Sequence, residues 1–139
     1  MKIITVSDVE LIAHKLAQEA LSFNEPIPGF DTRFPNVLES CLLTPFQTFG
    51  RKSLYKGLLG KASILFYLMI KKRPFKNGNK RIAVTALLSF LYFNDRWLKA
   101  NIEELYSFAM WIAESPSGSK EGTLLAIESF LRQYVIAKK

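Results

Sequence analysis

Two long apolar segments, residues 54–72 and 79–93, are joined by a short polar and cationic turn, and this arrangement constrains the fold more than any other feature of the chain. The turn and its flanks have the sequence Arg73-Pro74-Phe75-Lys76-Asn77-Gly78-Asn79-Lys80-Arg81-Ile82-Ala83. Pro74 disfavours right-handed helical geometry at Arg73, and Asn77-Gly78-Asn79 tolerates positive φ. Successive backbone N–H groups can therefore converge on one point, which predicts an anion-binding turn.

The two apolar segments are predicted to be helices that hold this turn at both ends. Residues 62–70 are apolar on nearly all sides of a helix, which is typical of a central, buried one. Its end at Lys71-Lys72 complements the helix dipole. Asn79 suits the N-cap of the second helix, so the positive end of that helix would face the anion, with Lys80 and Arg81 beside it.

The rest of the chain predicts four more helices and therefore an all-α fold of about six helices. His14 lies on the first of them, away from its apolar line of Val9, Ile12 and Leu16, so we expect a surface or half-buried side chain and no catalytic role. The expected ranges are 8–23, opened by a capping box at Ser7, then 35–45, 101–115 and 120–137, with an extended connection over 96–100.

The segment from Phe46 to Lys52 breaks the helical pattern, because it mixes aromatic side chains, a glycine and cations in a stretch too short for a helix. Two interpretations are equally open. It is a flap or hairpin that presents its aromatic rings, or it is an ordinary loop with Phe46 and Phe49 packed in the core.

Composition sets outer limits on the function. With 139 residues the chain fits one domain, 1–139, and its longest apolar run, Ile64 to Ile70, is far shorter than the ~20 residues that cross a bilayer. We therefore expect a cytoplasmic protein with no membrane partner. Cys41 has no disulfide partner and suits a core position. The net charge of +7 favours an anionic partner, but the cations concentrate around one glycine turn and do not line one face of a helix, which argues against a nucleic acid.

The turn resembles the signature of the Fic/Doc superfamily, and within it the death-on-curing (Doc) branch. That signature begins with His, followed by x-Phe-x, an acidic residue or in some Doc-like members Asn, then Gly or Ala and Asn-Lys-Arg. The residues that match as they stand are Phe75, Gly78, Asn79, Lys80 and Arg81. Arg73 stands where the family has His.

The resemblance implies a Fic/Doc helical bundle with a short flap or hairpin over the active-site loop. It also implies transfer of a phosphoryl or nucleotidyl group from ATP, with Mg²⁺, to a hydroxyl of a target protein such as elongation factor Tu, and control by an antitoxin of the Phd type. By resemblance Phe75 is a core anchor, and Lys80 and Arg81 are catalytic. The resemblance further implies that phosphate is bound by Asn77, Gly78, Asn79, Lys80 and Arg81, and that Asn77 holds Mg²⁺ weakly. It also implies that the target docks on a flap that includes Phe46, Thr48, Phe49 and Arg51.

Arg73 changes what the site can do. A guanidinium has no acceptor and stays protonated, so it cannot take a proton from a target hydroxyl as the family His does. Asn77 offers Mg²⁺ only a neutral dipole. The sequence therefore predicts a Doc-like toxin domain that is inactive or weakened in this form. The alternative is a degenerate, non-enzymatic Fic/Doc module that binds a protein partner or antitoxin. Whether Arg73 is natural or introduced stays open.

Overall fold

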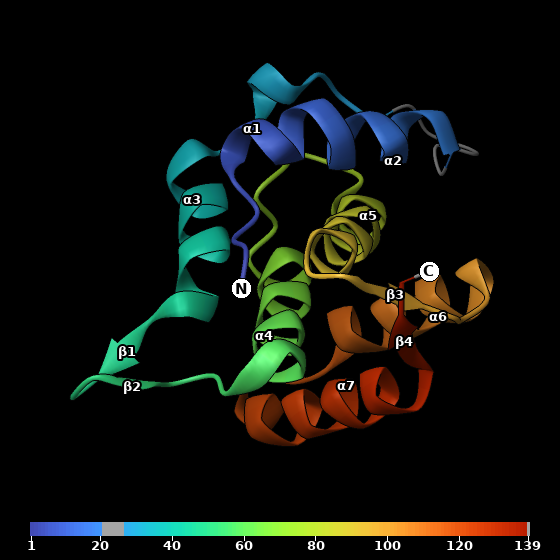
Figure 1. Ribbon diagram of the computed structural model, residues 1–139. Coiled ribbons are helices and arrows are strands. Elements are labelled where there is room, and N and C mark those ends of the chain that lie inside the picture. The colour runs from blue at the N-terminus through green and yellow to red at the C-terminus, as the bar shows by residue number, and fades with distance from the viewer. Residues whose placement is uncertain (21–26, 139) are drawn as a thin grey trace.

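The computed structural model describes residues 1–20 and 27–138, and it confirms the all-α fold: helices surround the pair α4 and α5, with only small strands (Figure 1). In chain order the elements are α1 (Val6–Asp8), the π-helix η1 (Val9–His14), α2 (Lys15–Ala20), the 3-10 helix η2 (Phe30–Thr32), α3 (Pro35–Leu43), the 3-10 helix η3 (Thr44–Phe46), β1 (Thr48–Phe49), β2 (Lys52–Ser53), α4 (Gly57–Lys71), α5 (Asn79–Phe93), β3 (Arg96–Leu98), α6 (Ile102–Glu114), the 3-10 helix η4 (Ser117–Ser119), α7 (Lys120–Tyr134) and β4 (Val135–Ala137).

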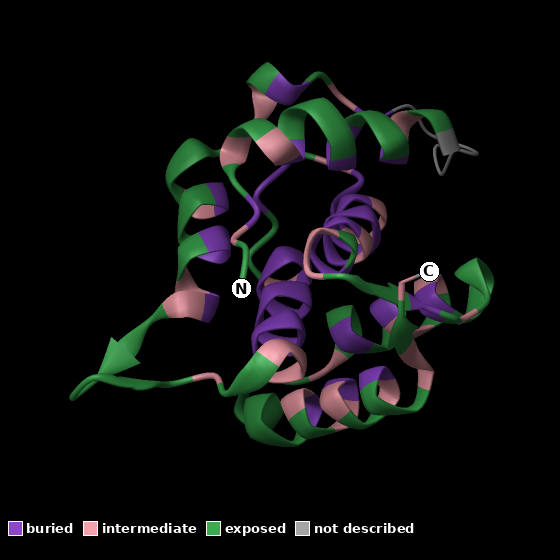
Figure 2. Ribbon diagram, viewed as in Figure 1, coloured by how far each residue is buried: buried purple, intermediate pink, exposed green. Residues whose placement is uncertain are grey.

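Helices α4 and α5 form the centre of the core, as their apolar composition predicts. Every residue of α4 from Lys61 to Ile70 is buried, and most of α5 is buried too (Figure 2). The bounds of α5 match the expected 79–93, whereas α4 begins at Gly57, three residues later than expected, because the hairpin strand β2 and a bend occupy residues 52–55. The two helices are joined by the cationic turn at their facing ends.

The first helix differs from its expected register. Thr5, and not Ser7, is the N-cap of a capping box with Asp8. The buried face carries Val9, Ala13 and Ala17, while Ile12 and Leu16 are about 40% exposed. In the π-helical turn η1 the backbone bonds span five residues, which changes the face that each side chain takes. The expected end of this helix, residues 21–23, lies outside the described residues.

Small side chains on that face let the first helix approach α5 closely. Thr85 of α5, itself buried, donates its hydroxyl hydrogen to the carbonyl of Ala13 at 2.7 Å. The same register buries His14, which is only 3% exposed, so the expectation of a surface or half-buried side chain is wrong. His14 Nε2–H donates to the carbonyl of Pro28 at 2.9 Å, which satisfies a ring nitrogen that would otherwise be buried without a partner.

Helix α3 covers the first half of the core. Pro35 occupies its first turn, where a missing N–H costs nothing, and Leu38, Cys41 and Leu42 are buried. Burial raises the pKa of the Cys41 thiol to about 11, since an apolar environment disfavours the thiolate. Cys41 is therefore a core residue, as expected.

A two-stranded hairpin, β1 and β2, follows α3. Gly50 and Arg51 both have positive φ, as a type I′ turn requires, so the hairpin interpretation of this segment is confirmed. Of the two aromatic side chains, Phe46 packs in the core as a loop residue would, and Phe49 is presented to solvent as a flap residue would be. Phe46 is half-buried and packs edge-on against Phe90 of α5, with ring centroids 6.2 Å apart, whereas Phe49 is 80% exposed.

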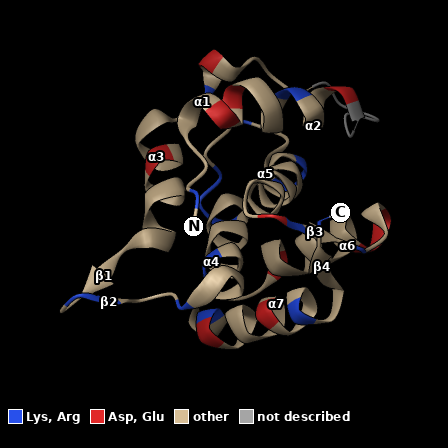
Figure 3. Cartoon of the chain, viewed as in Figure 1, with Lys and Arg blue, Asp and Glu red and all other residues tan. Residues whose placement is uncertain are grey.

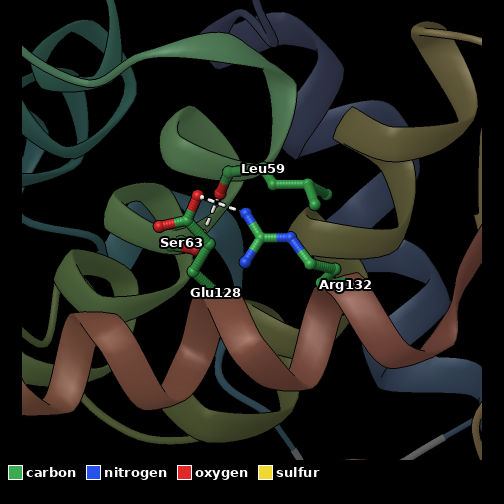
Figure 4. Close-up of polar contacts among 4 residues, drawn as sticks. All are labelled: Leu59, Ser63, Glu128 and Arg132. Atoms are coloured by element: carbon green, nitrogen blue, oxygen red, sulfur yellow. Dashed lines mark hydrogen bonds and ion pairs between the residues drawn. The ribbon is translucent and has the colours of Figure 1, made fainter.

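Helices α6 and α7, in the C-terminal half of the chain, pack against the core. Asn101 caps α6 as expected, by accepting a hydrogen bond from the Glu103 N–H. Helix α7 packs along α4: Glu128 and Arg132 of α7 form a 3.2 Å ion pair beside Leu59 and Ser63 of α4 (Figure 4). Helix α7 ends at Tyr134, before the expected 137, because residues 135–137 form β4 and pair with β3.

The turn after α5 holds two distant parts of the chain. The side chain of Asn94 bonds the backbone of Lys2, accepting from its N–H at 2.6 Å and donating to its carbonyl at 2.9 Å. The N–H of Lys138 donates to the carbonyl of Asp95 at 3.1 Å, and the ammonium of Lys138 lies 3.6 Å from the Asp95 carboxylate. Among the helices of the described residues, none has the length and apolar content needed to cross a membrane.

Candidate functional site

Phe75 anchors the cationic turn in the core, as expected. Its ring is 2% exposed and packs against the rings of His14 and Phe30, with centroids 5.5 and 5.9 Å away. Because these contacts come from two different segments, the turn is fixed to the first helix and to the η2 region at the same time. The His14 ring is thus a structural neighbour of the turn.

Asn79 closes the turn, and it does so in a way that the sequence did not reveal. The N-cap of α5 is Gly78, and no side-chain cap is present there, so the expectation that Asn79 is the N-cap is wrong. The amide of Asn79 instead accepts from the Phe75 N–H at 2.9 Å and donates to the Phe75 carbonyl at 2.8 Å. These two buried bonds satisfy a backbone that would otherwise have no partner. They join the two ends of the segment 75–79.

Gly78 takes the left-handed conformation that the Asn77-Gly78-Asn79 run predicted, with φ of +75°. Its α-carbon faces Ile27, and a Cβ built there would lie 2.9 Å from Ile27 Cγ1. On the same side the Phe34 N–H donates to the Pro74 carbonyl at 2.8 Å. Residues 27–34 therefore contact the turn at two more points, Pro74 and Gly78.

Replacing Gly78 with Ala is expected to lower the free energy of unfolding by about 1–3 kcal/mol, because the new Cβ meets Ile27 and an L side chain disfavours positive φ. Urea denaturation measures this change. Gly118→Ala is the matched control, since that glycine has no atom within 4 Å of the built Cβ and no positive φ; we expect a change below about 0.5 kcal/mol. Equal effects at both positions would contradict this description of the turn.

Arg73 lies at the start of the turn in a left-handed conformation, with φ of +51°, and its side chain is exposed. Pro74 excludes the right-handed helical geometry that would have continued α4, as predicted. A non-glycine residue with positive φ is held there only when the surrounding structure fixes it, and such residues cluster at functional sites. Here the fixing elements are the end of α4 and the buried Phe75.

A cleft of about 280 Å³ opens beside the turn, and residues 27–34 are not among those that line it. Four cationic side chains line it, from the end of α4, the turn and the start of α5; Figure 3 shows where cations lie along these elements. The lining residues are Ile70, Lys71, Arg73, Asn77, Gly78, Asn79, Lys80, Arg81, Tyr106 and Ala113. The structure therefore brings together Arg73 and all five residues that were expected to bind phosphate.

The opposite wall of the cleft is α6, which the sequence did not assign to the site. Tyr106 and Ala113 lie on this wall. Lys71 connects the walls, because its ammonium donates to the carbonyls of Ala113 at 3.3 Å and Ser115 at 2.5 Å, at the C-terminal end of α6. Lys71 was expected to complement the dipole at the C-terminal end of α4. It also binds carbonyl groups at the C-terminal end of α6. Nothing in the sequence near Tyr106 marks it as a site residue.

The hairpin residues Phe46, Thr48, Phe49 and Arg51 are not among those that line the cleft. Figure 1 shows the hairpin projecting from the end of α4 opposite to the cationic turn, so it does not lie over that turn as expected. The physical reason is connectivity: the hairpin leads into the first residue of α4, whereas the turn follows the last one. Target docking by these four residues stays a prediction.

The site suits an anion, and none of the described residues that line it is a His, an Asp or a Glu. The first N–H groups of a helix have no carbonyl one turn behind them, so the start of α5 adds a positive dipole to the four cations. Of the lining side chains, the only titratable group besides those cations is the phenol of Tyr106. Within residues 1–20 and 27–138, no three His, Cys, Asp or Glu side chains are grouped to hold a metal ion.

Comparison with known proteins places this site in a family. No curated protein and no solved structure matches the chain significantly. The Fic/DOC family matches residues 3–91, a range that includes α4, the cationic turn and all but the end of α5. Since this match covers more than half of the sequence and includes the turn that forms the cleft, the chain belongs to the Fic/DOC family.

Proposed function

We propose that this Fic/DOC domain is of the Doc type, that it binds the phosphates of ATP in the cleft, and that in its present form it transfers a phosphoryl or nucleotidyl group weakly or not at all. The observation that carries the proposal is the position of Arg73. It lines the same cleft as Asn77, Gly78, Asn79, Lys80 and Arg81, at the signature position where the family has its basic His.

The residues of the cleft fit a polyphosphate. Lys71, Lys80 and Arg81 supply charge-assisted hydrogen bonds, and the start of α5 supplies backbone N–H groups. The volume of about 280 Å³ is near the lower end of the range for small-molecule sites, which suits a phosphate chain better than a whole nucleotide. When bound, ATP would supply the group to be transferred. The chain's own residues hold and orient the phosphates.

The group that would accept a proton is what this cleft lacks. A target hydroxyl must lose its proton as it attacks, and the guanidinium of Arg73 cannot accept one. By family resemblance the target is elongation factor Tu and the regulator an antitoxin of the Phd type, both in the cytoplasm. We also propose that residues 1–139 act as one domain, because α6 forms a wall of the cleft and α7 packs along α4.

A second candidate function is a non-enzymatic module that binds a protein partner. The observation that favours it is the hairpin, where Phe49 is 80% exposed beside Arg51 and Lys52 and away from the cleft. An exposed aromatic ring near an arginine is typical of a protein contact. This candidate predicts a partner that co-purifies with the chain in the absence of any ATP binding.

Calorimetric titration with ATP tests the proposed function. We expect the chain to bind ATP, and Lys80→Ala to weaken binding about tenfold, because it removes a charge-assisted contact of roughly 1.4 kcal/mol. Lys76→Ala is the matched control: Lys76 is in the same turn and carries the same charge, yet it is exposed and does not line the cleft. Equal losses in the two variants would show that only net charge matters and would contradict the cleft as the site.

A further inference from the structure

The side chains of the cleft provide ligands for phosphate but not for a divalent cation. Four of them are cationic, two are neutral amides, one is a phenol and none is a carboxylate, in the part of the chain that the structure describes. Magnesium is held in proteins by one or two carboxylates together with substrate phosphates and water, in strict octahedral geometry. The Mg²⁺ that the family uses therefore does not fit the donor set of this cleft.

The neutral oxygens of the cleft do not replace the missing carboxylate. Asn79 Oδ1 accepts from the Phe75 N–H, and the Ala113 carbonyl accepts from Lys71 Nζ. The carboxylate nearest in sequence to this wall, that of Glu114, lines a different cleft together with Trp111 and Ser115. Asn77 contributes an amide dipole, which attracts a divalent cation far less than a full negative charge does.

From this donor set we infer that the cleft takes the polyphosphate of ATP without a divalent cation, and that Mg²⁺ weakens the binding. The inference rests on the proposed function, since it concerns the same ligand in the same cleft. Its physical basis is charge. A bound Mg²⁺ cancels two negative charges of the triphosphate. It also brings a divalent cation close to four cationic side chains that repel it, those of Lys71, Arg73, Lys80 and Arg81. Free ATP keeps all of its attraction to these four groups.

Titration of the unaltered chain with ATP, once in EDTA and once in excess Mg²⁺ at equal ionic strength, tests this inference. Equal ionic strength is required because salt screens every interaction of this kind. We expect ATP to bind about tenfold more tightly in EDTA, the effect of two partly exposed charge contacts. Binding that is equal in the two buffers, or tighter with Mg²⁺, would overturn the inference and leave the proposed function standing. An absence of binding in both buffers would overturn both.

Asn77→Asp provides a second measurement, because it places in the cleft the carboxylate that other family members carry. In this variant we expect Mg²⁺ to strengthen ATP binding, which reverses the order found for the unaltered chain. The control is Asn36→Asp, an equal change of charge at an exposed position in the first turn of α3, outside the cleft; it should keep the original order. If Asn77→Asp binds ATP more weakly with Mg²⁺ than without it, the assignment of the mismatch to the missing carboxylate is wrong.

Discussion

Replacing Arg73 with His is expected to raise transfer of label from ATP to a protein target by about 10² to 10⁴, the usual contribution of a positioned general base. The imidazole would enter a cleft that already gathers Lys80, Arg81 and the start of α5, so the substitution places a proton acceptor beside the phosphate-binding groups. His also tolerates the positive φ of position 73 better than most residues do. Incubation of the variant with ATP labelled on its α- or γ-phosphate, in a bacterial lysate, measures both the rate and the group transferred.

The control for this experiment is Arg51→His. Arg51 is also exposed and also has positive φ, at +69°, but it lies in the hairpin and not in the cleft. It should give no increase in labelling. Growth arrest on expression of the Arg73→His variant, but not of the Arg51→His variant, is the cellular counterpart. If the Arg73→His variant folds with an unchanged melting temperature and still labels nothing, the chain is better described as a binding module.

Replacing Asn79 with Ala is expected to lower the free energy of unfolding by about 2–6 kcal/mol. The change removes two hydrogen bonds and leaves the buried N–H and carbonyl of Phe75 without partners, at about 1–3 kcal/mol for each group. Since small domains have total stabilities of about 5–15 kcal/mol, a loss of this size is visible as a large shift of the urea midpoint. ATP affinity should fall as well, because the turn is no longer closed.

Asn94→Ala is the control for this prediction. Asn94 bonds a backbone N–H and carbonyl in the same way, those of Lys2, but at a position that water can reach, and it also donates to the part-buried carbonyl of Phe90 at 2.9 Å. Water replaces the lost bonds there, so we expect a cost of only about 1 kcal/mol. The comparison sets two fully buried bonds against bonds that are mostly exposed. Equal costs for the two variants would show that the Asn79 bonds are not what holds the turn.

The sequence was sufficient where local chemistry decides the structure. The bounds of α5, the positive φ of Gly78 and the break at Pro74 follow from residue types that permit few backbone conformations. The burial of residues 62–70 follows from their largely apolar composition, whereas that of Lys61 was not expected. The five expected phosphate-binding residues meet in one cleft because they are neighbours in the chain, held between two helices.

The parts that sequence reasoning missed depend on contacts between distant segments. An Asn at the start of a helix can cap that helix or bond the backbone of another residue. Asn79 bonds the backbone of Phe75 because Phe75 is buried against His14 and Phe30. Residues 135–137 continue a helical pattern, and only their pairing with β3, far earlier in the chain, makes them a strand. Tyr106 reaches the cleft because α6 packs on α5, which no local pattern reveals.

The turn that follows α5 has a practical consequence for spectroscopy. Residues near both extremities of the described chain, Lys2 and Lys138, are fastened to the adjacent residues Asn94 and Asp95. The cleft lies at the other extremity of α5, about 20 Å away along a helix of this length. A fluorophore coupled at either lysine would thus report whether the polypeptide has folded while staying clear of the nucleotide, and a pair of fluorophores there would give efficient energy transfer only in the folded molecule.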